Sequence, residues 1–332
     1  MATPTRARIY RGTPRTLARL ARALQRGELV AVPTETVYGL AANALDPRAC
    51  RAIFRAKGRP SSDPLIVHIH NLAQLESIAE TNPETLLLAK HFWPGPLTIV
   101  LPKRKVVPDI VSAGLPSVAV RMPAHPLFRR LLKHTNLPLA APSANPFGYV
   151  SPTTAAHVQD GLGSKIRHIL DGGPSSIGVE STIVDLRNPR SPRLLRPGAI
   201  TRTDIERVLG RTVKTPRRAA SAQAQVAPGL MARHYSPRTP AVLHRKLPSA
   251  AQAAAHIEEA WIYFARPASL PPSAKNIFWL HEEGELAGAA RHLFAVLRRA
   301  DRQRFRRIHL ERAPGRGLAD AINDRLQRAA AR

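Results

Sequence analysis

Residues 57–65 read KGRPSSDPL, and the fold can be worked out from this stretch. Two cations, Lys57 and Arg59, stand two residues apart, separated by a glycine and followed by a proline. A helical pattern over residues 46–56 precedes them, and an apolar run over residues 65–69, typical of a strand, follows. A helix that ends at a glycine near a proline presents both cations from a stiff loop. A guanidinium fork beside an ammonium group suits a polyphosphate.

The composition limits what such a loop can do. The length of 332 residues favours two domains, and 44% hydrophobic residues are enough for a sizeable core. No apolar run approaches the roughly 18 residues of a membrane span, so we expect no membrane contact. The single cysteine, Cys50, rules out a disulfide framework and a cysteine-based zinc site. The chain begins without an apolar leader, and we therefore expect a cytoplasmic protein.

The net charge of +27 favours a phosphate-bearing partner, which could be a nucleotide or an RNA. The alternative is an arginine-biased proteome, in which a loop lysine or arginine belongs to a solvated surface. Aromatic residues make up 5% of the chain, and no basic motif with interleaved aromatics is present. Charge alone therefore predicts no RNA-binding module.

The order of elements predicts two α/β domains joined by a linker. Strands and helices intermix without strict alternation over residues 1–210, which favours a mixed, twisted sheet. Residues 211–240 are rich in Ala, Gln, Arg and Pro and read as a linker. Strands and helices alternate over residues 241–332, which predicts a small three-layer, Rossmann-like domain. Because this domain lacks G-x-G-x-x-G, we expect it to support or gate a site in the first domain.

Polar loops follow several short apolar runs, and loops at strand ends on one edge of a sheet converge on one cleft. These loops span residues 33–40, 57–64, 117–121, 142–145, 178–182 and 196–198. One group has the cations and hydrogen-bonding side chains that hold a triphosphate and a purine: Lys57, Arg59, Ser143, Asn145 and Arg196. The other group suits a small polar acid: Thr34, Thr36, His68, Arg121 and Ser181.

Each of these residues has a plainer explanation. Thr36 would bond backbone in a turn, and His68 would be a hydrogen-bonded strand histidine. Arg121 would pair with a structural acid instead of clamping a substrate carboxylate. Ser143 and Asn145 would only shape a proline turn. The alternatives stay open for each residue taken singly.

Together the loops carry motifs long enough to be specific. They are PTETVYGL (33–40), KGRPSSDPL (57–65), WPGPLT (93–98), VAVRMP (118–123), APSAN (141–145), GVESTIVD (178–185), LRPG (195–198) and PGLMARHYSP (228–237). In this order they resemble the threonylcarbamoyl-AMP synthase family, which has the YrdC-like fold, in its two-domain form. The linker motif followed by a small domain marks that form.

The resemblance implies an enzyme that joins L-threonine, bicarbonate or carbon dioxide, and ATP. Its product is threonylcarbamoyl-adenylate, pyrophosphate leaves, and a downstream transferase modifies an adenosine of certain tRNAs. Lys57 and Arg59 are the implied catalytic residues, since fixed cations neutralise developing phosphoryl charge. Mg²⁺ would accompany ATP, held by phosphate and water without a protein metal site. Direct contact with tRNA is a further possibility.

The resemblance also implies which residues bind each substrate. The implied ATP-binding residues are Lys57, Arg59, Asp63, Ser117, Ser143, Asn145, Ser151, Arg196 and Tyr235. The implied L-threonine-binding residues are Thr34, Thr36, His68, Arg121, Ala141 and Ser181, with a backbone group of Ala141 against the ammonium. The proline-rich linker would act as a lid that keeps water from the adenylate.

One position departs from the family, because Asp63 stands where an asparagine is usual. Its carboxylate would meet Mg²⁺, a neighbouring arginine or a ribose hydroxyl. Two other functions belong to the same fold. One is a non-catalytic RNA-binding protein. The other is a carbamoyl-adenylate module of hydrogenase maturation, for which additional domains and zinc-finger cysteines would be expected.

Overall fold

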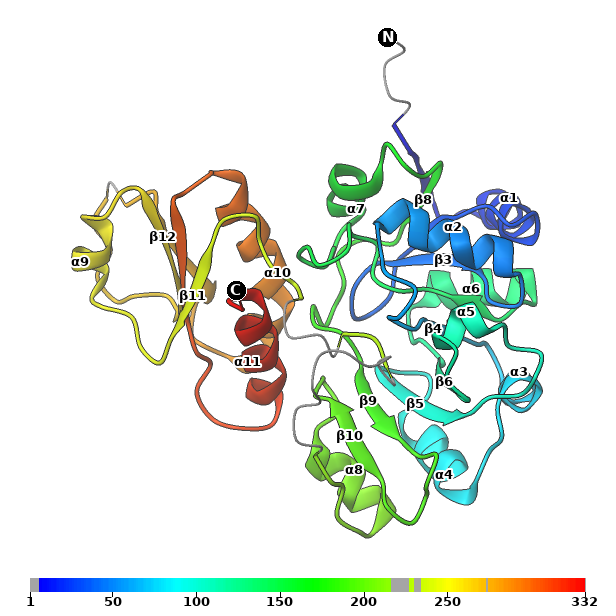
Figure 1. Ribbon diagram of the computed structural model, residues 1–332. Helices are drawn as coiled ribbons and strands as arrows, with labels where there is room; N and C mark the ends of the chain where they lie inside the picture. Colours follow the sequence, from blue (N-terminus) through cyan, green and yellow to red (C-terminus); the bar gives the residue numbers. More distant parts are fainter. Residues whose placement is uncertain (1–5, 216–226, 230–233, 273, 332) are drawn as a thin grey trace.

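The structure is a computed structural model that describes residues 6–215, 227–229, 234–272 and 274–331. Residues 216–226 and 230–233 of the predicted linker lie outside this part. The described residues form a ten-stranded mixed sheet and a separate four-stranded parallel sheet (Figure 1). Both sheets agree with the predicted mixed α/β domain followed by a Rossmann-like domain.

The first sheet pairs neighbours in both directions, for example β2 with β3 antiparallel and β4 with β6 parallel. Its strands, in spatial order, are β1 (Arg8–Arg11), β8 (His168–Asp171), β2 (Val30–Val32), β3 (Gly39–Asn43), β7 (Leu139–Ala140), β4 (Ile66–His68), β6 (Ser117–Arg121), β5 (Leu97–Pro102), β9 (Thr182–Asp185) and β10 (Arg193–Arg196). Most of these strands are short and apolar, and β2, β4, β6 and β9 are buried throughout.

Strand β3 corrects one prediction, because residues 33–40 were expected to form only a loop. A Cβ on Gly39 would come within 3.2 Å of the Cβ of Ala141, so a small residue is needed for this close approach. The loop therefore ends at Gly39, where strand β3 begins and pairs with the neighbouring strands of the sheet.

Helices cover both faces of the first sheet. They are α1 (Pro14–Gln25), α2 (Pro47–Lys57), α3 (Leu72–Ile78), α4 (Pro83–Phe92), α5 (Asp109–Ser112), α6 (Pro126–Thr135), α7 (Ala155–Leu162) and α8 (Arg202–Leu209). Successive residues of one strand contribute to different cores: Ala31 packs with Ile53 and Leu65, whereas Val30 packs with Leu17 and Phe128. This alternation is the two-residue period of a strand with apolar layers on both sides.

Helix α2 delivers the loop of residues 57–65. Asp46 caps its first turn by accepting a hydrogen bond from the Arg48 N–H, and Pro47 follows at the first helical position. Gly58 ends it in the left-handed conformation, with φ of 66°. Past this helix end, Arg59 donates to carbonyls of its own loop, whereas Lys57 donates to carbonyls of residues 143 and 145.

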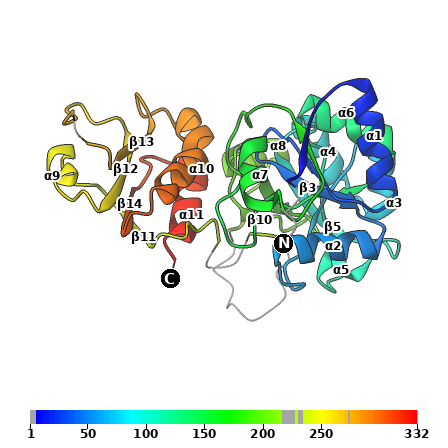
Figure 2. The same ribbon diagram turned by 90° about the horizontal axis from the view of Figure 1, so that it is seen from above.

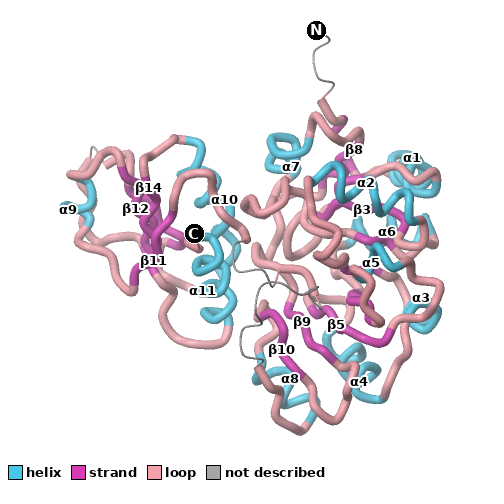
Figure 3. Tube along the Cα trace, viewed as in Figure 1, coloured by secondary structure: helices cyan, strands magenta, loops and turns pink. Residues whose placement is uncertain are grey.

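The second domain is a three-layer unit. Its strands, in spatial order, are β11 (Ala241–His244), β14 (Arg307–Glu311), β12 (Glu259–Ala265) and β13 (Ile277–His281). Its helices are α9 (Ala250–Ala254), α10 (Leu286–Arg302) and α11 (Leu318–Ala329). Helices α10 and α11 lie between this sheet and the first domain, whereas α9 and loops lie on the far side (Figures 2 and 3).

The two domains share an apolar core. Val150 and Val179 of the first domain pack in one cluster with Phe294 of α10 and Tyr235 of the linker. At Gly178, with φ of +85°, a Cβ would lie 2.4 Å from the backbone of α10, so no side chain fits there.

Within the described residues, no helix has the length and apolar character needed to cross a membrane.

Candidate active site

A cavity of about 50 Å³ lies where the loops of the first sheet meet the linker. It is lined by ten of the residues predicted for the site: Thr34, Thr36, Arg59, His68, Arg121, Ala141, Ser143, Ser181, Arg196 and Tyr235. Pro228, Gly229 and His234 of the linker also line it.

At one end of the cavity, Arg121 is fixed by three partners. At the end of β6, it donates from Nη2 to Glu35 Oε1 at 2.6 Å and from Nη1 to Thr36 Oγ1 at 3.0 Å. Its Nε donates to the Gly95 carbonyl at 3.2 Å. The Thr34 and Thr36 hydroxyl oxygens lie 2.8 Å apart. Arg121 therefore pairs with an acid of the protein, as the plainer explanation predicted, and it also lines the cavity.

Burial and charge settle the protonation of this Arg121 end, which comprises Thr34, Thr36, His68 and Arg121. Burial opposes ionisation of Glu35, but the Arg121 guanidinium outweighs it and lowers the pKa of that carboxyl. Burial, helped by Arg121, lowers the pKa of His68 to about 3. His68 is thus neutral at physiological pH, and its Nδ1 has no hydrogen-bond partner among the described residues.

Ser181 joins this end to the next cation. Its Oγ lies 2.8 Å from Thr98 Oγ1 and accepts a hydrogen bond from Arg196 Nη2 at 3.1 Å. Arg196 closes β10 and also donates from Nη1 to the carbonyl of Pro228 in the linker at 3.2 Å. Burial lowers the pKa of Arg196. The guanidinium thus bridges the sheet and the linker.

Lys57 lies behind the cavity wall. Its Nζ donates to the carbonyl oxygens of Ser143 at 2.6 Å and Asn145 at 2.5 Å. Burial, with Arg59 nearby, lowers the pKa of Lys57 well below its usual range. A phosphate that came close would favour the charged ammonium again. Lys57 thus suits a site that gains charge when an anion binds.

Arg59 lines the cavity and is held by its own loop. It donates from Nε to the Asp63 carbonyl at 3.0 Å and from Nη2 to the Pro64 carbonyl at 2.7 Å. The Asp63 carboxylate forms an ion pair with Nη2 at 3.0 Å, and both side chains are buried. Burial raises the pKa of Asp63, and Arg59 opposes that shift. Of the partners considered for Asp63, the structure brings the neighbouring arginine to it.

Five predicted residues do not line the cavity. They are Lys57, Asp63, Ser117, Asn145 and Ser151. Asn145 donates to the carbonyls of Pro146 and Tyr149 and so shapes its own loop. Ser117 opens β6, four residues before Arg121, and its buried Oγ has no hydrogen-bond partner in the described part of the chain.

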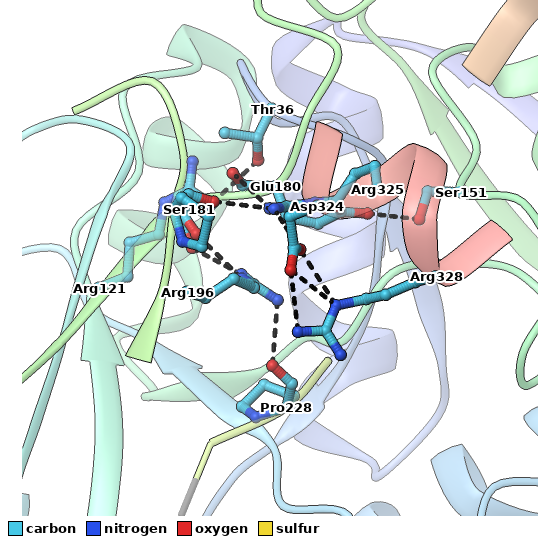
Figure 4. Close-up of polar contacts among 11 residues, drawn as sticks. Thr36, Arg121, Ser151, Glu180, Ser181, Arg196, Pro228, Asp324, Arg325 and Arg328 are labelled. Carbon is cyan, nitrogen blue, oxygen red and sulfur yellow. Dashed lines mark hydrogen bonds and ion pairs between the residues drawn. The ribbon is translucent and has the colours of Figure 1, made fainter. Parts of the chain in front are cut away.

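Sequence reasoning missed three charged residues at this site. Glu35 pairs with Arg121. Glu180 accepts a hydrogen bond from Ser151 Oγ at 2.5 Å, and Arg325 of α11 donates to Glu180 Oε2 at 2.9 Å (Figure 4). Both acids lie inside motifs quoted above, so buried acids among cations were a usable signal. Arg325 lies in a helix of the second domain and had no local signal.

Two linker residues complete the wall. Tyr235 adopts φ of 61° and is packed between His234, at 4.1 Å between ring centres, and Phe294, at 5.6 Å. Burial raises the pKa of Tyr235 and, together with the nearby Arg59 and Lys57, lowers the pKa of His234. The left-handed backbone of Tyr235 is unusual for a bulky residue, so the surrounding packing holds the linker in this conformation.

The two ends of the cavity suit different ligands. The Arg121 end offers a fixed guanidinium with hydroxyl groups, which is the arrangement that binds a small carboxylate. Lys57, Arg59 and Arg196, together called the cation cluster, offer three basic groups around His234. No group of three or more His, Cys, Asp or Glu side chains suited to a metal ion occurs among the described residues.

Two family models match the chain. The model described as "Telomere recombination" matches residues 22–198, and the model of the threonylcarbamoyl-AMP synthase C-terminal domain matches residues 200–331. Helix α8 falls within the second match although it packs against α4 of the first domain.

Relatives match over nearly the whole chain. The threonylcarbamoyl-AMP synthase of Pyrococcus abyssi is 43% identical over 92% of this chain and 91% of its own. The Bacillus subtilis enzyme of the same name is 40% identical over 95% and 92%. The crystal structure of P. abyssi Sua5 complexed with L-threonine superposes with a TM-score of 0.89 at 39% identity, covering 98% of both chains.

Proposed function

Because the chain belongs to the threonylcarbamoyl-AMP synthase family, we propose that it condenses L-threonine, bicarbonate or carbon dioxide, and ATP. The products would be threonylcarbamoyl-adenylate and pyrophosphate, which makes the protein a nucleotidyltransferase. One observation carries the proposal: Arg121 with its neighbouring hydroxyl groups lines the same cavity as Arg59 and Arg196 of the cation cluster. The P. abyssi structure with L-threonine supports the amino acid as one ligand.

In the proposed reaction, Arg121 binds the threonine carboxylate while Thr34, Thr36 and Ser181 line the pocket. A buried hydrogen bond to the threonine hydroxyl would reject analogues that lack this group. Neutral His68 has an unpartnered Nδ1 in the same wall and can serve as that partner. The amine, once it has become a carbamate, would then face the nucleotide.

The cation cluster would hold the phosphates. Attack of the carbamate oxygen on the α-phosphorus breaks the bond to pyrophosphate, and negative charge builds on the phosphoryl oxygens. Fixed cations aimed at that charge are an efficient source of catalysis. Lys57 and Arg59 are the proposed catalytic pair, with Arg196 beside them. Mg²⁺ bound to the phosphates would further neutralise the leaving pyrophosphate.

The wider role follows from the product. An activated threonylcarbamoyl group needs an acceptor, and we propose transfer to a tRNA adenosine by a separate transferase in the cytoplasm. The net charge of +27 is compatible with direct contact to the tRNA.

A pyrophosphate-release assay on the purified protein tests the proposal. We expect release that requires threonine, bicarbonate and ATP together and stops when any one is omitted. Release without threonine, or no release, would contradict it. Tight, salt-sensitive RNA binding without ATP turnover would instead favour the RNA-binding alternative.

A further inference from the structure

The second domain places one fully buried arginine against the wall of the cavity. Arg325 of α11 is 0% exposed and donates from Nε to Glu180 Oε2 at 2.9 Å. Its Nη1 donates to the Pro197 carbonyl at 2.8 Å, and the guanidinium lies 5.5 Å from the centre of the Tyr235 ring. One side chain from the second domain thus contacts two segments of the first domain and the linker. Figure 4 shows its contacts with Glu180 and Asp324.

The three partners of Arg325 lie beside residues assigned to ATP. Glu180 lines the cavity, and its other carboxylate oxygen accepts the hydrogen bond from Ser151 Oγ at 2.5 Å. Pro197 directly follows Arg196, and Tyr235 is itself assigned to ATP. No hydrogen bond or ion pair between described residues joins Arg325 to Thr34, Thr36, His68 or Arg121. The described contacts of Arg325 therefore involve residues bonded or adjacent to those assigned to ATP, although Ser181, assigned to threonine, directly follows Glu180.

The geometry of Arg325 is fixed from its own helix as well. Asp324 Oδ2 lies 3.0 Å from Arg325 Nη1, and Arg328 forms an ion pair with Asp324 at 2.9 Å. Burial opposes a charged Arg325, but the Tyr235 phenol and the Glu180 carboxylate outweigh it and hold the pKa of Arg325 above its usual value. Removing one partner of such a buried pair leaves the other charge uncompensated. Without Arg325, the Glu180 carboxylate would have to turn away or draw in water.

We propose that Arg325 is a positioning residue for ATP, supplied by the second domain. It holds Glu180 so that Ser151 keeps its orientation, and it holds Tyr235 and the segment around Arg196 against the nucleotide. This inference rests on the proposed function, because it assumes that the cavity binds ATP. It gives the second domain a defined task at a site whose other assigned residues come from the first domain and the linker.

The test measures the equilibrium binding of ATP, and separately of threonine, to the full-length protein by isothermal titration calorimetry. We expect Arg325→Gln to weaken ATP binding about tenfold and to leave threonine binding within twofold. Glu180→Gln should give the same selective loss of ATP binding. The double variant should bind ATP no more weakly than the single variant with the lower ATP affinity, because both substitutions act through one pair.

Arg302→Gln is the matched control. Arg302 of α10 also crosses between the domains, where it pairs with Asp160 of α7, but both side chains are about half exposed. This variant should bind both ligands like the wild type.

Three outcomes would overturn the inference. Wild-type ATP affinity in Arg325→Gln would show that the contact is dispensable. Equal losses of ATP and threonine binding would show a general structural role. If Arg325→Gln does not fold, wild-type ATP affinity in Glu180→Gln would decide against the proposed role of Arg325. Failure of the wild type itself to bind ATP would overturn the proposed function.

Discussion

At the Arg121 end of the cavity the cation is paired with a carboxylate, whereas Lys57 and Arg196 in the cation cluster donate to neutral oxygens. Arg121 lies 2.6 Å from Glu35 Oε1. Lys57 donates to two backbone carbonyls, and Arg196 donates to two carbonyls and the Ser181 hydroxyl.

The difference means that pairing with Glu35 fixes the position of Arg121, whereas the cation cluster mainly supplies positive charge. A guanidinium already paired with an acid is held rigidly and can still donate its remaining N–H groups to a second partner such as a small carboxylate. Lys57 and Arg196, which are held by neutral dipoles, have pKa values lowered by burial, while Arg59 of the same cluster is paired with Asp63. The first arrangement suits an amino acid, and the second suits a polyphosphate.

The largest expected effect comes from the cation cluster. Lys57→Met keeps the volume of the side chain but removes the charge, and we expect kcat/KM for pyrophosphate release to fall at least about 100-fold. Lys103→Met is the control, because Lys103 does not line the cavity and forms an ion pair with the exposed Asp109. Circular dichroism would check that both variants fold. A rate near that of the wild type in Lys57→Met would remove Lys57 from its assigned role.

The Arg121 end should instead show its difference in stability. Arg121→Gln leaves the buried Glu35 carboxylate without its cation, and we expect the free energy of unfolding to fall by about 3 kcal/mol. Adding Glu35→Gln should recover part of that loss, because the stranded charge is removed. Urea denaturation at pH 7 measures both. Arg207→Gln, which breaks the exposed pair with Asp204, should stay close to the wild type.

A smaller loss than that of Arg207→Gln, or no recovery in the double variant, would show that the Arg121 pair does not hold this end together.

His68 makes the stability of the Arg121 end depend on pH. Its folded pKa of about 3 lies below the ordinary value of 6.5, so between these values the unfolded chain binds a proton that the folded protein does not. Stability is therefore lost as pH falls below 6.5, by about 1.4 kcal/mol per unit from this group. We expect His68→Gln to lose about 2 kcal/mol less than the wild type between pH 6.5 and 5.

Urea denaturation at the two pH values measures this difference, with the surface variant His91→Gln as the control. Identical pH slopes in the wild type and His68→Gln would contradict a neutral, buried His68.

The smallest effect concerns Asp63, the acid inside the cation cluster. Asp63→Asn keeps the shape and removes a negative charge beside Arg59, so we expect the KM for ATP to fall about threefold. Asp109→Asn, on the surface, should leave this KM unchanged. A rise would show that the carboxylate itself is needed, and an unchanged KM would show that it does not influence ATP at all.

Much of the fold could be predicted because its signals are local. Asp46-Pro47 and Gly58 mark the two ends of α2, and short apolar runs mark most buried strands. Strand β3 was missed because GLAAN has no β-branched or aromatic residue, so its pairing depends on neighbours far away in the sequence.

The site was predicted less completely than the fold. The cations and hydroxyls of its loops could be chosen by residue type, whereas Glu35 and Glu180 were passed over although both lie inside the quoted motifs, since an acid beside an anionic substrate looks unfavourable until its cation is known. Arg325 could not be predicted either. It lies on an amphipathic helix, where a charged residue normally faces solvent, and the contact between domains buries it.

Binding of both ligands to two variants tests the division of the cavity most directly. Threonine and ATP would each be titrated into Lys57→Met and Arg121→Lys, the second of which keeps the charge but loses the fork. We predict that Lys57→Met loses ATP affinity and keeps threonine affinity within about threefold, and that Arg121→Lys does the reverse. Loss of the same ligand in both variants would contradict the account.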